Sequence, residues 1–473
     1  MYQNKLFTLL NTLSQREMTA FQKHLSRHFT RQDIPTTVFL HVRRYYPGFS
    51  KTDVHPTVTH RALFPSEPYN RNRILNAYSD IYLQLRAFLL AEGIKKHPAR
   101  FRYAWMSILK ERGLEAESQQ EALLLREEVQ ALPRKEVADY LKSMETCYYF
   151  TYLTNQSRTK PDLEALQSYA HYLDTYYAVC RLKAACEMLN LNRQHTHRFS
   201  MDTVLPLLEM IGKIPDTGHP LLHCYLEIYQ LLATQDERHF TRMESLLTKY
   251  AGQIAVSDLH ILISYLHNYA TPKIRDGVQA YRPRVHRIDK LALQYDVFSS
   301  KGAMSPSQFN NIVNVACTLK DFDWAEHFIL KQGPYLEDDI RQVTVELAKA
   351  TFYFEQRLFI QALICLEGAQ LRDEHHLIRA SILKSMILFE RNPEDPLIDS
   401  TCTNFEQNLY RIRTRMPAAA DSALRFVRIF RLLKKSEQSQ AFILDQIDQP
   451  GQLAYRDWLL EKAKKYRPKF AAR

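Results

Sequence analysis

Apolar side chains recur along most of the chain at spacings of three and four residues, the spacing that lines up one face of an α-helix. Two clear examples are Ile74, Tyr78, Ile81, Leu85, Phe88 and Leu89, and later Leu259, Leu262, Ile263, Leu266 and Tyr269. The sequence has no alternating runs flanked by hairpin turns, which would be typical of β-strands. The pattern therefore predicts an all-α protein of about twenty helices.

Several helix boundaries can be read from the sequence. Most of the 20 prolines fall between the periodic segments, where they begin or end helices. Ser14-Gln-Arg-Glu17 is a capping box, which predicts a helix from there to about His28. The longest stretch without Gly or Pro, residues 162–205, predicts a long helix over roughly its first thirty residues.

The clearest repeat lies between residues 305 and 392. Segments 309–316 and 324–330 are expected to form one helical hairpin, 343–354 and 358–369 the next, and 376–389 a further helix. Ala350, Tyr353, Ala362, Leu366 and Ala369 have the spacing of tetratricopeptide signature positions, where small side chains let two helices approach closely. The expected fold is all-α, an α-α superhelix of stacked helical hairpins. This would be a tetratricopeptide-like solenoid with an N-terminal helical region.

Charge is distributed unevenly along the 473 residues. Lys and Arg outnumber Asp and Glu by 17 to 6 in residues 1–110 and by 15 to 7 in 404–473, whereas acidic residues lead by 39 to 31 between them. With the periodicity, this predicts a basic N-terminal helical domain over 1–112, a helical-repeat region over 113–403 and a basic C-terminal helical cap over 404–473. Such asymmetry indicates either nucleic-acid binding or self-association through the basic ends and the acidic middle.

Glycine is scarce, which excludes several kinds of site. The chain contains 11 glycines, and the closest two are Gly212 and Gly218. A P-loop, a dinucleotide-binding turn and a nucleophile elbow all require glycines that lie closer together. The sequence therefore contains none of these three.

The cysteines and the hydropathy pattern indicate the compartment. The seven cysteines lack paired short spacings, and most fall within apolar helical patterns, so they predict buried thiols in a reducing environment rather than disulfides. No segment reaches the roughly 18 uncharged apolar residues of a membrane helix, and the first residues lack a signal-peptide cleavage pattern. We expect a cytoplasmic protein without membrane contact.

Several segments resemble a known family. They are Leu-Leu-Asn-Thr-Leu-Ser14-x-x-Glu17, the stretch from Ala62-Leu-Phe-Pro65 to Phe88-Leu89, Leu173-Asp174-x-Tyr-Tyr177 through Cys186-x-Met-Leu-Asn190, and residues 309–390. Together they resemble an uncharacterised family of tetratricopeptide-like helical proteins common in Bacteroidota genomes. The resemblance covers most of the chain and implies a cytoplasmic helical-repeat protein. Its motifs are structural positions, so it implies no functional residue.

Three sets of two histidines are candidate metal ligands. His24 and His28 would share one helix face, but a zinc site needs further ligands, and Arg27 and Arg31 would repel a cation. The alternative is a solvated basic face. Weaker patterns are His195-x-His197 and His375-His376. We expect no metal and no cofactor.

Motifs for catalysis also have structural alternatives. Ser107-x-x-Lys110 and Ser381-x-x-Lys384 match a serine-nucleophile motif whose partner motifs are missing. The acidic run that begins at Glu337 would favour a helix N-terminus through the helix dipole. We therefore expect no catalytic residue and no enzyme activity.

Tyrosines form the first candidate binding surface. Tyr148 and Tyr152 lie with Tyr149 on one expected helix, and Tyr169, Tyr172 and Tyr176 lie with Tyr177 on the next. If the two helices faced each other, the rings would line a groove for a peptide or for stacked bases. Ordinary packing between helices is the alternative.

A C-terminal basic patch is the second candidate, and its residues are Arg411, Arg413, Arg415, Arg428, Arg431 and Lys435. On the helix that contains Arg428, an apolar arc of Phe426, Ile429, Phe430 and Leu433 predicts a buried face opposite a cationic one. Further cations follow between Lys462 and Lys469. The patch indicates a solvated face, an acidic protein or self-contact, or nucleic-acid phosphates.

The function expected from these observations is a non-enzymatic helical-repeat scaffold that binds a protein or peptide partner. Stacked helix pairs produce extended surfaces suited to that role. The alternative is a helical array that binds nucleic acid through its basic N- and C-terminal regions.

Overall fold

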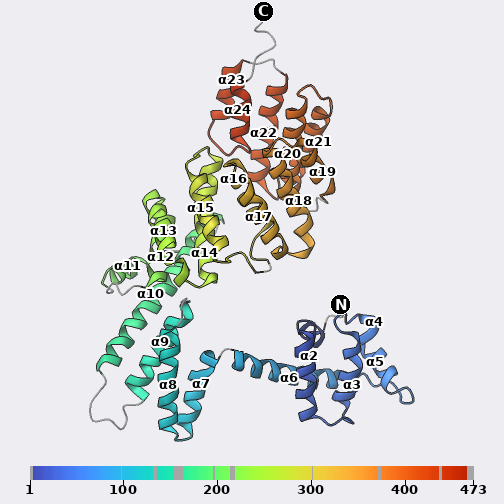
Figure 1. Cartoon of the computed structure of the whole chain (residues 1–473), viewed down its shortest axis with the longest axis vertical. Helices are drawn as coiled ribbons and strands as arrows, with labels where there is room; N and C mark the ends of the chain where they lie inside the picture. Colours follow the sequence, from blue (N-terminus) through green and yellow to red (C-terminus); the bar gives the residue numbers. More distant parts are fainter. Residues whose placement is uncertain are drawn as a thin grey trace, which may run out of the picture. The chain divides into compact units, whose positions relative to one another are not determined.

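The computed structural model describes residues 4–96, 98–131, 136–153, 163–194, 198–213, 219–300, 302–369, 374–435 and 439–465. All regular elements within these ranges are helices, so the all-α prediction is confirmed (Figure 1). The helices form two compact units. Unit 1 contains residues 1–131 and 145–165, and unit 2 contains residues 132–144 and 166–473.

Unit 1 begins with α1 (Lys5–Leu10), α2 (Gln15–His28), α3 (Ile34–Val42), η1 (Arg43–Tyr45), α4 (Lys51–Val54), α5 (Pro56–Leu63) and α6 (Arg71–Lys96). The capping box predicted at the start of α2 is confirmed. The Glu17 amide donates to Ser14 Oγ at 3.2 Å, and the Ser14 amide donates to Glu17 Oε2 at 2.9 Å. Of the apolar stripe predicted on α6, Ile74, Tyr78, Ile81, Leu85 and Phe88 are buried in one core with side chains of α1 to α3. α7 (Pro98–Glu111) and α8 (Glu115–Gln130) then form a pair with a smaller core.

The segment that follows contributes to both units. It consists of α9 (Val137–Tyr148), the π-helical turn η2 (Tyr149–Leu153) and α10 (Leu163–Gln194). The long helix predicted within residues 162–205 is therefore confirmed as α10. Its apolar face, which includes Val179, Leu182 and Cys186, is buried in the largest core of unit 2.

The rest of unit 2 is a series of helices joined by short connections. They are α11 (Leu205–Ile211), α12 (Pro220–Thr234), α13 (Glu237–Tyr250), η4 (Ala251–Gln253), α14 (Val256–Arg275), α15 (Tyr281–Gln294), α16 (Pro306–Thr318), α17 (Phe322–Gln332), η5 (Gly333–Tyr335), α18 (Asp338–Glu355), α19 (Phe359–Gly368), α20 (Glu374–Arg391), α21 (Leu397–Ile412), α22 (Pro417–Lys435), α23 (Gln440–Asp448) and α24 (Arg456–Lys465). The helices predicted between residues 305 and 392 are confirmed as α16 to α20. Asp338 and Asp339 lie in the first turn of α18, as the acidic run predicted.

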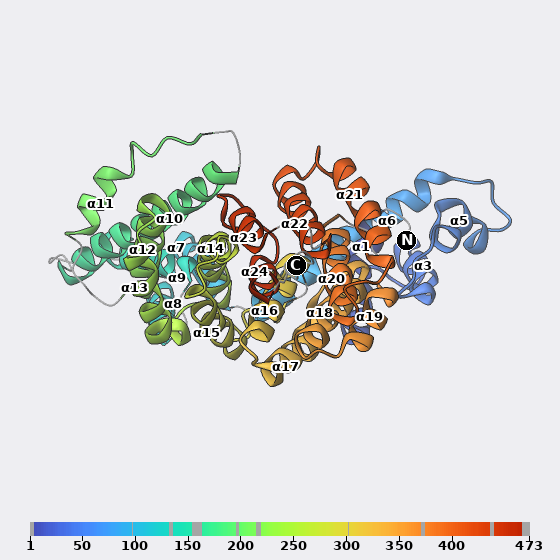
Figure 2. The same cartoon turned by 90° about the horizontal axis from the view of Figure 1, so that it is seen from above.

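Most helices of unit 2 pack as consecutive pairs, namely α12 with α13, α14 with α15, α16 with α17, α18 with α19, and α20 with α21. The first helix of each pair also contacts the first helix of the next pair. These contacts join α16 to α18, α18 to α20, and α20 to α22 (Figure 2). Ala350 and Ala362 are fully buried where α18 meets α19. Their small side chains allow the close approach that the sequence predicted.

Two hydrophobic cores stabilise unit 2. One extends along the chain from Tyr140 to Ala348, and the other from Val343 to Ala463. In the second core the ring centroid of Trp458, on α24, lies 5.6 Å from that of Phe389 and 6.0 Å from that of Phe430. The C-terminal helices thus share a core with α18 to α20, and α21 contains the predicted boundary at residue 403. The boundaries at 112 and 403 stay predictions.

Six of the seven cysteines, Cys180, Cys186, Cys224, Cys317, Cys365 and Cys402, are free thiols. Five are buried, as the apolar patterns predicted, whereas Cys147 and Cys180 are half-buried. Burial raises the pKa of Cys224 to about 12, with a smaller contribution from Glu227. This thiol is therefore protonated and unreactive at neutral pH.

Candidate functional site

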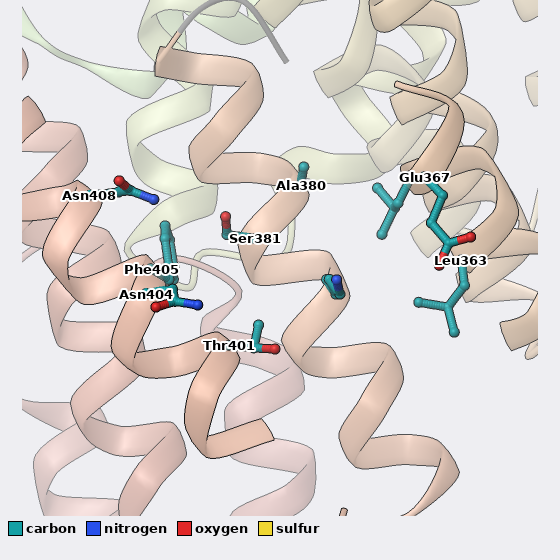
Figure 3. A pocket seen from close by; sticks show the side chains of 10 residues that line it. Leu363, Glu367, Ala380, Ser381, Thr401, Asn404, Phe405 and Asn408 are labelled. Carbon is teal, nitrogen blue, oxygen red and sulfur yellow. The ribbon is translucent and has the colours of Figure 1, made fainter. Parts of the chain in front are cut away.

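A groove lies where the α18–α19 pair meets the α20–α21 pair, with a cavity volume of about 270 Å³ (Figure 3). We call it the seam groove. Its lining residues are Leu363, Leu366 and Glu367 of α19, Ala380, Ser381 and Lys384 of α20, and Thr401, Asn404, Phe405 and Asn408 of α21. Three consecutive helices, which belong to two neighbouring pairs, therefore contribute to one depression.

The side of the groove formed by α21 follows directly from helix periodicity. Thr401, Asn404, Phe405 and Asn408 have spacings that place them on one face. Phe405 is buried in the core, whereas Asn404 is exposed and Asn408 half-buried. The buried ring fixes the rotation of the helix, and that rotation presents both amides along the groove.

The seam groove combines hydrogen-bonding groups with an apolar floor. Each asparagine amide has two N–H donors and one carbonyl acceptor, so it complements both polar groups of a peptide backbone. Phe405 provides apolar surface beside them, and Leu363 and Leu366 provide apolar surface on the α19 side of the groove. Glu367 and Lys384 are exposed charges of opposite sign on different helices. This arrangement suits an extended polypeptide segment better than a small substrate.

The serine–lysine motif of α20 lies in this groove but shows no catalytic geometry. Ser381 and Lys384 both line the groove, one helical turn apart. Among the described contacts there is no hydrogen bond between the Ser381 hydroxyl and the Lys384 amine, which a serine nucleophile needs for activation. The geometry provides no support for acyl transfer at Ser381.

The predicted tyrosine cluster is divided between the two units. In unit 1, Tyr148 and Tyr152 have ring centroids 5.0 Å apart and are 37% and 49% exposed. In unit 2, Tyr169, Tyr172 and Tyr176 lie half-buried on α10, and Tyr176 packs against the largest core. That these two sets line one groove stays a prediction.

The C-terminal basic patch is partly neutralised. Three of its arginines form ion pairs: Arg413 with Asp421, Arg415 with Glu374, and Arg431 with Glu406, each at 2.7 Å. Arg411, Arg428 and Lys435 are exposed. The apolar arc Phe426, Ile429, Phe430 and Leu433 is buried, which confirms the amphipathic interpretation of α22. Lys462 pairs with Glu390 in the second core region, and Arg467 and Lys469 lie outside the described residues.

The histidines form no complete metal site within the described ranges. The rings of His24 and His28 have centroids 4.7 Å apart and planes tilted by 47°, and burial followed by the His28 charge lowers the pKa of His24. No group of three or more His, Cys, Asp or Glu side chains in the described part of the chain has metal-binding geometry. His195 and His197 lie outside the described residues.

A second cavity, of about 400 Å³, lies between α14, α15, α16, α20, α22 and the segment 452–458. We call it the arginine cavity because Arg275, Arg282, Arg379 and Arg456 line it. Sequence reasoning missed it, although one signal was present. Ser307, Asn311, Asn314 and Thr318 form a polar face on α16, opposite buried residues such as Phe309 and Val313.

No helix in the described part of the chain is long and apolar enough to span a membrane. No family model matches the chain, and comparisons with curated proteins and with solved structures found no similar protein.

Proposed function

We propose that this protein is a non-enzymatic helical-repeat scaffold that binds an extended segment of a partner protein in the seam groove. The proposal includes the finer architecture, a tetratricopeptide-like superhelix of stacked hairpins. It also includes membership of the Bacteroidota family that the sequence resembles, and action in the cytoplasm.

The pairwise packing of unit 2 supports the scaffold role. When helix pairs stack, each junction between pairs leaves a surface seam, and neighbouring seams form an extended binding face. The contacts from α16 to α22 follow this scheme. The seam groove is such a junction, between α19 of one pair and both helices of the next.

One observation carries the proposal: the amides of Asn404 and Asn408 line the same groove one helical turn apart (Figure 3). An extended chain exposes an N–H and a C=O at every residue, and two amides in series can pair with successive peptide groups. The leucines on the α19 side of the groove would cover one apolar side chain of the segment. We therefore expect the groove to bind the segment mainly through the segment's backbone and to select only weakly among its side chains.

Selection from a random peptide library tests the proposal. A library of about 12 residues per peptide, displayed on phage, is selected on the immobilised full chain and then on the Asn404→Ala/Asn408→Ala double variant. We expect enriched sequences that bind the wild-type chain and not the double variant. Failure to enrich any sequence, or enrichment of sequences that bind both proteins equally, would count against the seam groove.

A further inference from the structure

We propose that the arginine cavity is a binding site for a small phosphate-bearing anion, held chiefly by Arg275 and Arg379. This inference is independent of the seam groove, because the cavity is lined by other residues and other helices. Figure 2 shows α24 next to α22, and the first residues of α24 contribute to the cavity wall.

The carboxylates that line the cavity are already paired. Asp457 contacts the guanidinium of Arg282 and accepts a hydrogen bond from Gln279. Glu355 forms an ion pair with Lys320 at 2.9 Å. Arg456, also on the wall, pairs with Asp448 at 2.9 Å. Neither wall carboxylate therefore pairs with the two remaining arginines.

Arg379 is oriented by neutral groups. Its Nη2 donates to Asn311 Oδ1 at 2.6 Å, and its Nη1 donates to the Asn310 carbonyl at 3.4 Å. These contacts fix the plane of the guanidinium against α16 without neutralising its charge. A planar guanidinium held in this way retains further N–H donors for an anion.

Arg275 brings a second positive charge to the same cavity. Loss of hydration, followed by repulsion from Arg379, lowers the pKa of Arg275, and the charge of the adjacent Asp276 opposes this shift only in part. Arg275 is an exposed residue at the end of α14, and it is one of the residues that line the cavity. An arginine stays protonated at any physiological pH, so the repulsion persists until an anion enters. Two guanidiniums around one dianion form the geometry that favours phosphate.

The polar wall would recognise the rest of the ligand. Asn310 is only 1% exposed, and its Oδ1 has no hydrogen-bond partner among the described residues. Asn310 is one of the residues that line the cavity, and an unpaired acceptor there would suit a ligand hydroxyl group. A volume of about 400 Å³ lies within the range of small-molecule sites. The ligand class is therefore a hydroxylated phosphate ester of low molecular mass.

Calorimetric titration of the full chain with pyrophosphate, at low ionic strength, tests the site. We expect saturable binding at one site per chain, weakened at least about tenfold by Arg379→Gln and by Arg275→Gln. Arg428→Gln, which removes an exposed arginine of α22 outside the cavity, should bind as the wild type does. If Arg379→Gln fails to fold, the Arg275→Gln titration decides the question.

Three results would overturn the proposal. They are no saturable binding of pyrophosphate, equal binding by the wild-type and Arg275→Gln chains, and tighter binding of citrate than of pyrophosphate, which would indicate a carboxylate site. The Asn404→Ala/Asn408→Ala variant should bind pyrophosphate normally, so a failure of the seam-groove proposal would be seen separately.

Discussion

The hydroxyl of Tyr225 donates a hydrogen bond to Asp258 Oδ1 at 2.6 Å, in a part of unit 2 where Asp258 is only 2% exposed. The same oxygen accepts from Lys183 Nζ at 2.7 Å, which joins α10, α12 and α14. Burial, followed by the charge of Asp258, raises the pKa of Tyr225 far above its usual range. The tyrosine is therefore a permanent donor, and the network orients three helices.

Removal of Asp258 should destabilise unit 2 more than removal of the tyrosine hydroxyl does. Asp258→Ala leaves a buried donor and a lysine without their shared acceptor, and we expect a loss of about 3 kcal/mol in the free energy of unfolding. Tyr225→Phe should cost about 1–2 kcal/mol. Urea titration measures both. Tyr410→Phe, at a 58% exposed position, is the control and should change stability by less than about 0.5 kcal/mol. Equal costs for the two core variants would contradict the network.

The close approach of α18 and α19 makes a second prediction. Ala350 and Ala362 are fully buried, so a larger side chain has no space there. Ala362→Leu should lower the free energy of unfolding by about 1–3 kcal/mol through overpacking. The control is Ile360→Ala on the same helix. Because Ile360 is 64% exposed, this substitution should be nearly neutral. Thermal unfolding of the two variants distinguishes these outcomes, and a neutral Ala362→Leu would contradict the tight junction.

A pH-dependent contribution is expected between the α14–α15 and α16–α17 pairs. Asp321 accepts from His286 Nε2 at 2.9 Å and pairs with Lys290 at 2.6 Å, and these hydrogen bonds lower the pKa of Asp321 below its ordinary 3.8. Since the folded-state pKa is the lower one, the stabilisation is complete above pH 3.8 and is lost as the pH falls through the folded-state value.

The matched test compares the wild-type chain with Asp321→Asn. At pH 7 the variant should be less stable by about 1 kcal/mol or less, because the pair is partly exposed. That difference should shrink as the pH drops below 3.8. A difference that grows on acidification would show that the sign is wrong.

The scaffold proposal also predicts an outcome for nucleic acid. Because Arg413, Arg415 and Arg431 already pair with carboxylates, the basic patch offers fewer charges to phosphates than the sequence suggests. We expect no shift of DNA or RNA in a gel assay at about 50 mM salt, a concentration at which phosphate contacts are strong. A shift that weakens steeply with added salt would favour the nucleic-acid alternative.

Local features of the fold could be predicted from the sequence. The capping box at Ser14 depends on residues three positions apart, and the apolar stripe of α6 depends on one helix. The alanine spacing of α18 and α19 involves neighbouring helices joined by a short turn. In each case the interacting residues lie close in sequence, so spacing alone was sufficient.

The candidate sites depend on contacts that spacing does not encode. Leu363, Ser381 and Asn404 meet only because two helix pairs pack together. Likewise Arg379 of α20 donates a hydrogen bond to Asn311 of α16, and the two residues are 68 positions apart in sequence. The basic patch was identified as cationic, but its partners Glu374, Glu406 and Asp421 come from other elements or other helix faces. Sequence periodicity located the helices, but it does not predict which side chains of different helices contact each other.

The most direct test of the central proposal is the affinity of one selected peptide for the full chain, measured by fluorescence anisotropy. The Asn404→Ala/Asn408→Ala variant should raise the Kd at least about tenfold, whereas Gln407→Ala, at an exposed position of the same helix outside the groove, should leave it unchanged. Circular dichroism of each variant confirms that α21 is folded. An unchanged Kd in the folded double variant would contradict the assignment of the seam groove as the partner-binding site.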